Sequence, residues 1–225
     1  LLVYFALYSI MNPKLNNISE EGDVLRFTLH GLNVSLANAI RRTILSDIPT
    51  VVIETDTYKT NQCTIHTNSG RLHNEILKQR LSCIPIHTKK LRDDDEGKAL
   101  PGNYCLELDM KNDGENMVFV TSGDFRLRNK SDNKLLTKDE MNTLFPDLFP
   151  VNSITRSHID FARLRPKMGE GIPGEQLKLS AEFTVSTAKI SSMFNVVSKC
   201  AYGNTPDLTK ASEVWEGHEK KLRSE

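Results

Sequence analysis

The sequence has no excess of charge of either sign, because Lys and Arg together number 29 and Asp and Glu together also number 29. It therefore lacks the overall positive field by which a protein binds nucleic acid through counterion release. The chain is also poor in cysteine, and its four cysteines form no CxxC pair: Cys63, Cys83, Cys105 and Cys200. Scattered cysteines are typical of reduced thiols rather than a secreted disulfide scaffold, so we expect an intracellular protein.

The sequence also has no apolar run long enough to cross a membrane. Residues 1–10 are apolar and uncharged, but they fall well short of the ~20 residues that a bilayer requires. They have neither the basic start nor the small-residue cleavage site of a signal peptide. Because Met11 and a polar Asn-Pro-Lys segment follow at once, we interpret residues 1–11 as a non-native leader that arises from upstream read-through. We predict no membrane association.

The common catalytic signatures are absent: the sequence has no GxSxG elbow, no HExxH motif and no Walker GK[ST] motif. A GxGxxG string occupies residues 169–174, but it contains Pro173 and precedes a predicted strand rather than a helix. We interpret it as an inter-strand loop. The acidic run at residues 93–96 is interpreted as a solvated loop, since adjacent carboxylates there point in several directions. We therefore expect no catalytic residues and no cofactor.

One group of side chains leaves a metal-dependent hydrolase open as an alternative. Two cysteine–histidine pairs with C-x2-H and C-x3-H spacing supply four possible ligands: Cys63, His66, Cys83 and His87. Such a set can surround a tetrahedral zinc. The spacing is loose, however, and a free cysteine at the apolar end of a helix commonly packs as a small hydrophobe. We assign no metal to these residues, and the zinc content of the purified protein discriminates between the readings.

The composition is that of a globular protein, with 38% hydrophobic and 26% charged residues. The chain is long enough for one large domain or two small interlocked domains.

The first half of the chain is predicted to alternate strands and helices. Residues 25–30 alternate apolar and polar side chains, which predicts a strand. The helical spacing that follows predicts a helix capped by Ser35 and ending near Asp47, before Pro49. Residues 50–55 predict a buried strand, and residues 72–81 predict a second helix.

The second half of the chain is predicted to be rich in strands. Residues 104–110 and 117–121 flank an Asn-Asp-Gly turn and predict a hairpin. Residues 177–185 show the longest strict alternation, which predicts a strand with one dry and one wet face. Residues 89–103 have loop chemistry. From residue 210 the chain is predicted to be a charged, weakly helical tail that carries the only tryptophan, Trp215.

Three ordered sequence blocks carry a family resemblance. Residues 35–54 read SLANAIRRTILSDIPTVVIE, with Asn-x-x-Arg-Arg on a helix followed by a turn at proline and a strand. Residues 68–87 read NSGRLHNEILKQRLSCIPIH, a helix ending in Arg-Leu-x-x-Ile-Pro. A third block covers residues 159–179 and 186–200. Together they resemble the alpha family of RNA polymerase subunits over residues 15–217, and they are most similar to the third-largest subunit of large DNA virus enzymes.

This resemblance implies an α+β fold in which an alpha-subunit-type dimerization domain is interrupted by an inserted mixed, strand-rich domain. The implied boundaries are 12–58 for the first part of the dimerization domain and 59–203 for the inserted domain. Residues 204–225 form a charged segment leading back to an incomplete dimerization domain. The cysteine-rich zinc loop of some cellular relatives is missing from the sequence. We expect the chain to be a fragment of a longer protein. An eleventh-subunit-like partner fused downstream is one candidate for the remainder.

The resemblance further implies a noncatalytic subunit that pairs with a smaller alpha-like, eleventh-subunit-like polymerase subunit. The pair would dock the second-largest catalytic subunit and small assembly subunits, and it would meet DNA only through the complex. The expected location is the nucleus or a cytoplasmic viral factory, with packaging in the virion as a further option. The predicted dimer and assembly interface comprises Leu36, Asn38, Ala39, Ile40, Arg41, Arg42, Thr43 and Ile44. The second family block contributes Arg71, Glu75, Arg80, Leu81, Ile84 and Pro85.

Two alternatives stay open for these residues. The apolar stripe on the first helix is also compatible with an ordinary internal core, because such stripes normally pack within the chain. A second alternative is an independent nucleic-acid-binding module that uses the basic residues Arg126, Arg128, Arg163, Arg165 and Lys167. The salt dependence of DNA binding by the isolated chain discriminates this module from an assembly subunit.

Overall fold

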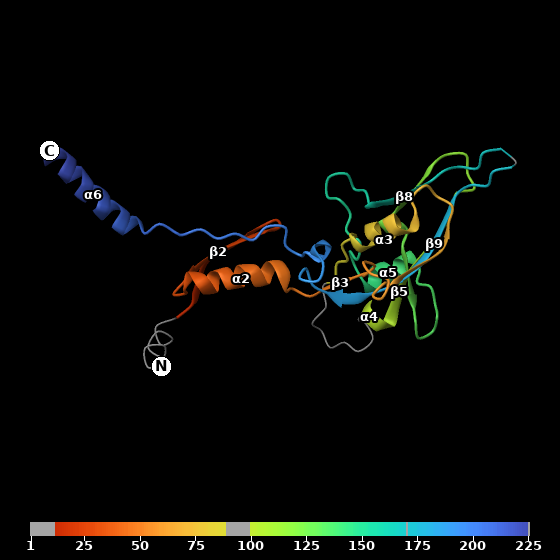
Figure 1. Ribbon diagram of the computed structural model, residues 1–225, viewed down its shortest axis with the longest axis horizontal. Coiled ribbons are helices and arrows are strands. Elements are labelled where there is room, and N and C mark those ends of the chain that lie inside the picture. Colours follow the sequence, from red (N-terminus) through yellow and green to blue (C-terminus); the bar gives the residue numbers. More distant parts are fainter. Residues whose placement is uncertain (1–11, 89–99, 170, 225) are drawn as a thin grey trace. The chain divides into compact units, whose positions relative to one another are not determined.

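The structure is a computed structural model that describes residues 12–88, 100–169 and 171–224 (Figure 1). Helices and antiparallel strands are mixed along the chain, so the predicted α+β class is confirmed. The acidic run at residues 93–96 and the interpreted leader at residues 1–11 lie outside the described residues. Within the described part of the chain, no helix has the length and apolar character needed to cross a membrane.

The chain divides into two compact units. Unit 1 combines both ends, Leu1–Leu45 and Val197–Glu225, and unit 2 is the continuous middle, Ser46–Val196. A middle unit between two halves of another unit is the arrangement that an insertion produces. Residues 46–58 group with the middle unit, whereas the predicted domain boundary lies at residue 58. The assignment of residues 12–58, 59–203 and 204–225 to domains stays a prediction.

The described residues of unit 1 form a hairpin and two helices. Strands β1 (Lys14–Glu21) and β2 (Val24–His30) pair antiparallel, and Gly22 adopts a positive φ of 58° at the turn. Helix α2 spans Val34–Ser46 and α6 spans Leu208–Ser224. The predicted strand at residues 25–30, the first helix and the helical tail are confirmed. Strand β1 was not predicted, because its sequence KLNNISEE contains only two large apolar residues.

The predicted cap of α2 is wrong by two residues. The backbone N–H of Ser35 donates to Oδ1 of Asn33 at 2.9 Å, and the N–H of Leu36 donates to the backbone carbonyl of Asn33 at 3.0 Å. Asn33 therefore satisfies the first free amides of the helix. Ser35 lies inside the first turn instead, since the helix starts at Val34.

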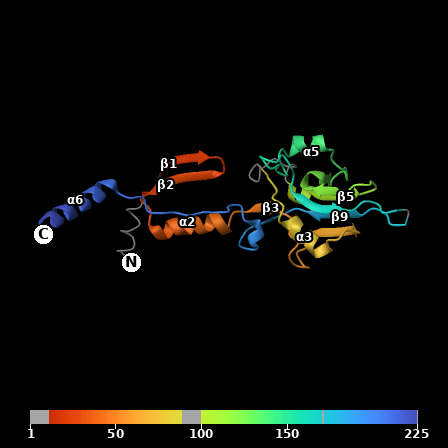
Figure 2. The same ribbon diagram turned by 90° about the horizontal axis from the view of Figure 1, so that it is seen from above.

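Unit 2 is built around a four-stranded antiparallel sheet in the order β4–β9–β5–β7. These strands are Cys63–Asn68, Gln176–Glu182, Tyr104–Lys111 and Arg126–Asn129. Strands β5 and β9 run side by side at its centre (Figure 2). Alternate side chains of both strands are buried, including Leu106, Leu108, Leu177 and Leu179. The alternation predicted at residues 177–185 is confirmed from Leu177 to Phe183, but it is wrong at the end: β9 stops at Glu182, and in the next strand, β10, Val185 is exposed and Ser186 is buried.

Smaller elements complete unit 2. Helix α3 (Asn74–Ser82) buries Leu77 and Leu81 in the core, which confirms the second predicted helix. Two strand pairs accompany the sheet: β6 (Val118–Thr121) with β8 (Asp160–Leu164), and β3 (Thr50–Val52) with β10 (Thr184–Ser186). The short helical segments are α4 (Leu100–Asn103), η1 (Ser122–Asp124), α5 (Lys138–Leu144) and η2 (Ser192–Phe194).

The predicted hairpin between residues 104–110 and 117–121 is wrong. Strand β5 pairs with β9 and β7, whereas β6 pairs with β8. The turn itself exists, because Oδ1 of Asn112 accepts the N–H of Gly114 at 3.0 Å. However, Nδ2 of Asn112 donates to the carbonyls of Asn116 and Leu164 at 2.8 and 2.9 Å. These bonds tie the turn to the end of β8, so the chain crosses from one strand pair to another instead of folding back.

The glycine-rich segment at residues 169–174 lies between β8 and β9, which confirms its interpretation as an inter-strand loop. A Cβ atom added to Gly174 would lie 1.5 Å from the backbone oxygen of Asn112. This contact leaves no room for a side chain at position 174. The third glycine of the GxGxxG string is therefore explained by close backbone packing rather than by phosphate binding.

Replacing Asn112 with alanine is expected to destabilise unit 2 by about 2–3 kcal/mol, because it leaves two backbone carbonyls without donors near a buried site. Asn112 is 1% exposed. Urea denaturation followed by far-UV circular dichroism measures this loss. Asn152→Ala is the matched control, since its side chain accepts two amides in an exposed turn. Equal losses for the two variants would contradict the role assigned to Asn112.

Candidate assembly interface

Helix α2 presents an apolar stripe that the described parts of the chain leave accessible. None of its residues is buried, and Leu36 and Ile40 are 43% and 44% exposed. Ala39 and Thr43 are exposed and Ile44 is half-buried. At 100° per residue these side chains share one side of the helix. We call the set Leu36, Ala39, Ile40, Thr43 and Ile44 the α2 stripe. The alternative of an internal core receives no support from these exposures, and the interface role stays a prediction.

The polar members of the first block flank this stripe. Nε of Arg41 donates to Oδ1 of Asn38 at 3.0 Å, one helical turn earlier. Arg42 is exposed and points about 100° away from Arg41 around the helix. The two arginines therefore lie on different sides of the α2 stripe, and their role in an interface stays a prediction.

The β1–β2 hairpin adds further accessible apolar side chains to unit 1. Leu15, Leu25 and Phe27 are all exposed, and Leu15 lies directly opposite Leu29. A two-stranded sheet of this kind is marginally stable in water unless another element covers one face. The sequence indicated the apolar alternation in β2 but not the hairpin, so this part of the candidate interface was missed.

The second family block is mainly structural. Leu81 and Ile84 are buried in the core of unit 2, whereas Arg71, Glu75 and Pro85 are exposed. The side chain of Arg80 crosses to β8. Its Nε donates to the carbonyl of Phe161 at 2.9 Å and its Nη2 donates to the carbonyl of Asp160 at 2.7 Å.

Arg80 therefore joins the second block to the third, which begins at Ile159. The junction leaves a shallow hollow lined by Gln79, Arg80, Cys83, Ile84, Ile159, Asp160 and Phe161. Because the guanidinium satisfies two backbone carbonyls of β8, it also protects that strand from pairing with another chain. The structure brings these two blocks together, while the first block is divided, with residues 35–45 in unit 1 and residues 46–54 in unit 2.

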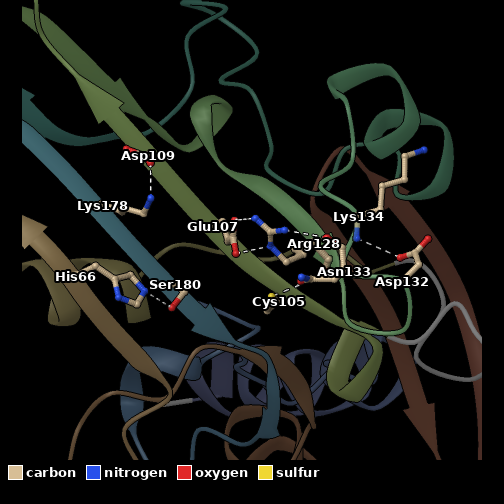
Figure 3. Close-up of polar contacts among 10 residues, drawn as sticks. All are labelled: His66, Cys105, Glu107, Asp109, Arg128, Asp132, Asn133, Lys134, Lys178 and Ser180. Atoms are coloured by element: carbon tan, nitrogen blue, oxygen red, sulfur yellow. Dashed lines mark hydrogen bonds and ion pairs between the residues drawn. The ribbon is translucent and has the colours of Figure 1, made fainter.

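The solvent face of the unit 2 sheet carries paired charges (Figure 3). Arg128 donates from Nε and Nη2 to the two carboxylate oxygens of Glu107, at 2.5 and 2.7 Å. Lys178 lies 2.7 Å from Asp109. The hydrogen bond from Arg128 lowers the pKa of Glu107, and the hydrogen bond from Lys178 lowers the pKa of Asp109. Both carboxylates are therefore charged partners of these bases at neutral pH.

The basic residues of the nucleic-acid alternative are largely engaged in such contacts. Arg165 donates from Nε to Oε1 of Glu175 at 2.5 Å, and Glu175 is buried. Arg163 lies 4.9 Å from the ring centroid of Phe119 and 3.6 Å from a carboxylate oxygen of Asp160. Arg126 has a buried Nη1 without a hydrogen-bond partner in the described structure. Arg163 and Lys167 are the exposed bases of this group, and Arg163 already contacts Phe119 and Asp160, so the five residues do not form an open basic patch.

The four possible zinc ligands are not gathered into one site. Cys63 is buried in the core, and its burial raises the pKa of the thiol to about 11. Nε2 of His66 lies 2.8 Å from Oγ of Ser180 on the sheet face, while Cys83 and His87 are exposed after α3. Among the described residues, no three His, Cys, Asp or Glu side chains are placed to hold a metal ion together. A buried, protonated thiol is a poor metal ligand.

Residues 26–219 match the RNA polymerase Rpb3/Rpb11 dimerisation domain. The chain belongs to this family. The match covers most of the chain, from β2 through α2 and all three blocks into α6, and it confirms the resemblance to the alpha family of polymerase subunits at the level of the family.

Three polymerase subunits are a quarter to a third identical to the chain over the aligned residues. It is 31% identical over 135 residues to DNA-directed RNA polymerase subunit Rpo3 of Pyrococcus furiosus, covering 60% of this chain and 42% of that protein. It is 25% identical over 221 residues to DNA-directed RNA polymerases I and III subunit RPAC1 of Homo sapiens, covering 90% and 57%. It is 27% identical over 204 residues to DNA-directed RNA polymerases IV and V subunit 3B of Arabidopsis thaliana, covering 85% and 57%. The chain thus spans about half the length of these relatives.

Proposed function

We propose that this chain acts as a noncatalytic assembly subunit of a DNA-directed RNA polymerase. Membership of the Rpb3/Rpb11 dimerisation family supports the proposal, and the relatives compared above are themselves named as polymerase subunits. The observation that carries it is the α2 stripe, which lies in a helix without a single buried residue. A soluble protein exposes an apolar surface of this kind mainly where another protein covers it.

In this proposal the partner of unit 1 is a smaller alpha-like, eleventh-subunit-like polymerase subunit. Helix α2 and the β1–β2 hairpin supply the apolar contact, and Arg41 and Arg42 contact the partner at its edges. An obligate interface of this type buries about 2,000 Å² or more and is rich in apolar side chains. Co-expression of the two subunits, followed by size-exclusion chromatography, is expected to give a stable one-to-one complex. Two separate monomers would contradict the pairing.

The resulting heterodimer would then dock the second-largest catalytic subunit and small assembly subunits. Unit 2 offers the exposed part of the second block, Arg71, Glu75 and Pro85, for this contact. The strand-rich middle of the chain would be the inserted domain of the family, which the division into units supports. DNA would be met only through the assembled enzyme.

The origin and location of the protein belong to the same proposal. We place it inside the cell, in the nucleus or in a cytoplasmic viral factory, with packaging in the virion as an option. The similarity to large DNA virus subunits and the fusion to a downstream eleventh-subunit-like partner stay predictions. The relatives compared above are archaeal, human and plant proteins.

The isolated chain is expected to bind duplex DNA no more tightly than about 10⁻⁴ M at physiological salt, because its net charge is zero and most arginines of the alternative site are paired. Fluorescence anisotropy with a labelled duplex over a series of salt concentrations measures this affinity. A micromolar affinity that falls steeply with salt would favour the independent nucleic-acid-binding module instead.

A further inference from the structure

Residues 150–159 form a loop of unit 2 that leads into β8 and displays apolar side chains to solvent. Ile154 is 88% exposed, and Val151 and Ile159 are 45% and 38% exposed. Apolar side chains scattered singly over a surface are normal, but several of them on one short loop indicate a contact site. We call residues 150–159 the Ile154 loop.

Hydrogen bonds to Asn152 fix the conformation of this loop. Oδ1 of Asn152 accepts the backbone N–H groups of Ile154 and Thr155, both at 2.9 Å. Its backbone carbonyl accepts the N–H of Arg156 at 2.9 Å, and its own N–H donates to the carbonyl of Ser157 at 3.0 Å. Arg156 has a positive φ of 58°, which is uncommon for a residue with a long side chain. The loop is therefore a defined turn with Ile154 at its tip.

Both ends of the Ile154 loop are attached to the core of unit 2. Leu148 and Phe149, which precede it, are buried, and the carbonyl of Leu148 accepts the N–H of His87 at 2.9 Å. At the other end, the buried hydroxyl of Ser122 accepts the N–H of Ile159 at 3.2 Å. The N–H of Ser122 donates to the carbonyl of Ile159 at 2.9 Å. A loop held in this way loses little conformational entropy when it binds another protein.

Two shallow hollows meet at Ile159. One has a volume of about 330 Å³ and lies within the loop, between Pro150 and Ile159. The other is the hollow at the end of α3, which Ile159 also lines. Ile84 belongs to the wall of this second hollow, and Pro85, the exposed residue of the second block offered above for docking, follows it directly. The Ile154 loop is therefore continuous with the proposed docking surface of the second block.

The charges along this surface are mainly positive. Arg156 is exposed, and no described carboxylate pairs with it, while Arg80 lines the second hollow. The one acidic side chain that lines either hollow, Asp160, lies 3.6 Å from Arg163. An occupant with apolar side chains and a carboxylate is therefore favoured over a basic one. A second copy is disfavoured, since a two-fold contact through Ile154 would bring two Arg156 side chains together.

We propose that the Ile154 loop is a preformed docking element for the second-largest catalytic subunit. Ile154 enters an apolar pocket of that subunit, and Arg156 pairs with an acidic residue at the edge of the pocket. A large apolar side chain of the same subunit fills the hollow beside Pro150. The inference rests on the proposed function, because the identity of the partner comes from the continuity of the loop with the docking surface of the second block.

The test titrates the purified second-largest subunit into the heterodimer of the full chain with the smaller alpha-like subunit, by calorimetry. Ile154→Asp is expected to weaken binding by about 100-fold, because its carboxylate enters an apolar pocket without a partner. Ile190→Asp is the matched control, at a residue of unit 2 that is 67% exposed and lies outside the loop, and it is expected to bind like the wild type. Unchanged binding by Ile154→Asp, or an equal loss for both variants, would overturn the docking element.

Arg156→Gln tests the chemistry of the partner. It is expected to weaken binding by about fivefold at low salt and to make binding less sensitive to salt, because it removes an ion pair. A salt dependence equal to that of the wild type would overturn the acidic partner. Self-association of the isolated chain that Ile154→Asp abolishes would assign the loop to a second copy and overturn the proposal. A wild-type heterodimer that does not bind the catalytic subunit at all would contradict the proposed function itself, and the docking element with it.

Discussion

Ile40→Asp is expected to abolish co-purification of the smaller alpha-like subunit, with a loss of affinity of about 100-fold or more. The residue lies at the centre of the α2 stripe and is 44% exposed in the free chain. An aspartate there costs little in the unbound protein, because it remains in water. In the complex its carboxylate would be buried against apolar side chains without a partner. Pull-down of a tagged partner from co-expressing cells, followed by titration of the purified proteins, measures the loss.

Related substitutions sharpen this result. Ile44→Asp and the double change of Arg41 and Arg42 to glutamate are expected to disrupt the pairing in the same way. Val34→Asp is the matched control, since it places the same carboxylate on the same helix about 120° from Ile40. Its side chain is exposed and lies outside the α2 stripe. Normal assembly of the Ile40 and Ile44 variants would refute the interface.

Phe125→Ala is expected to lower the free energy of unfolding of unit 2 by about 3–5 kcal/mol. Phe125 is fully buried, and its ring centroid lies 5.4 Å from that of Phe149 and 5.3 Å from that of Phe161. Truncation removes both edge-to-face contacts and leaves a cavity in the core. Chemical denaturation followed by far-UV circular dichroism measures the loss as a shift in the midpoint at constant slope.

Phe119→Ala is the control for this prediction. Phe119 is 49% exposed on β6 and contacts Arg163 instead of the core. Its removal is expected to change stability by about 1 kcal/mol or less. Equal effects of the two substitutions would show that the aromatic contacts around Phe125 do not organise the core.

Sequence reasoning was most successful where one element satisfies a simple periodicity. Leu177 and Leu179 of β9, and the 3.6-residue spacing of α2, each follow from burial or amphipathicity along a single segment. It failed where the outcome depends on a second segment. The Asn112 turn was recognised, but local turn chemistry does not specify that β5 pairs with β9, whose long alternation makes it a better partner than β6.

In the candidate interface, too, features set by a single segment were predicted and features that depend on a second segment were not. The α2 stripe was predicted because its members share one side of one helix. The role of Arg80 was not, since its acceptors Asp160 and Phe161 lie some 80 residues further along the chain and are backbone carbonyls, which no side-chain pattern indicates. The β1 strand escaped prediction because its polar composition gives no alternation to detect.

The composition of unit 1 from both ends of the chain has a consequence during protein synthesis. Helix α2 is synthesised before the middle unit, and the second segment of unit 1 follows that unit. At about 5–20 residues per second, roughly 150 residues take on the order of 10–30 s. During that interval the nascent helix exposes its apolar side chains to solvent, so we expect chaperones or a partner that binds cotranslationally to protect it from aggregation.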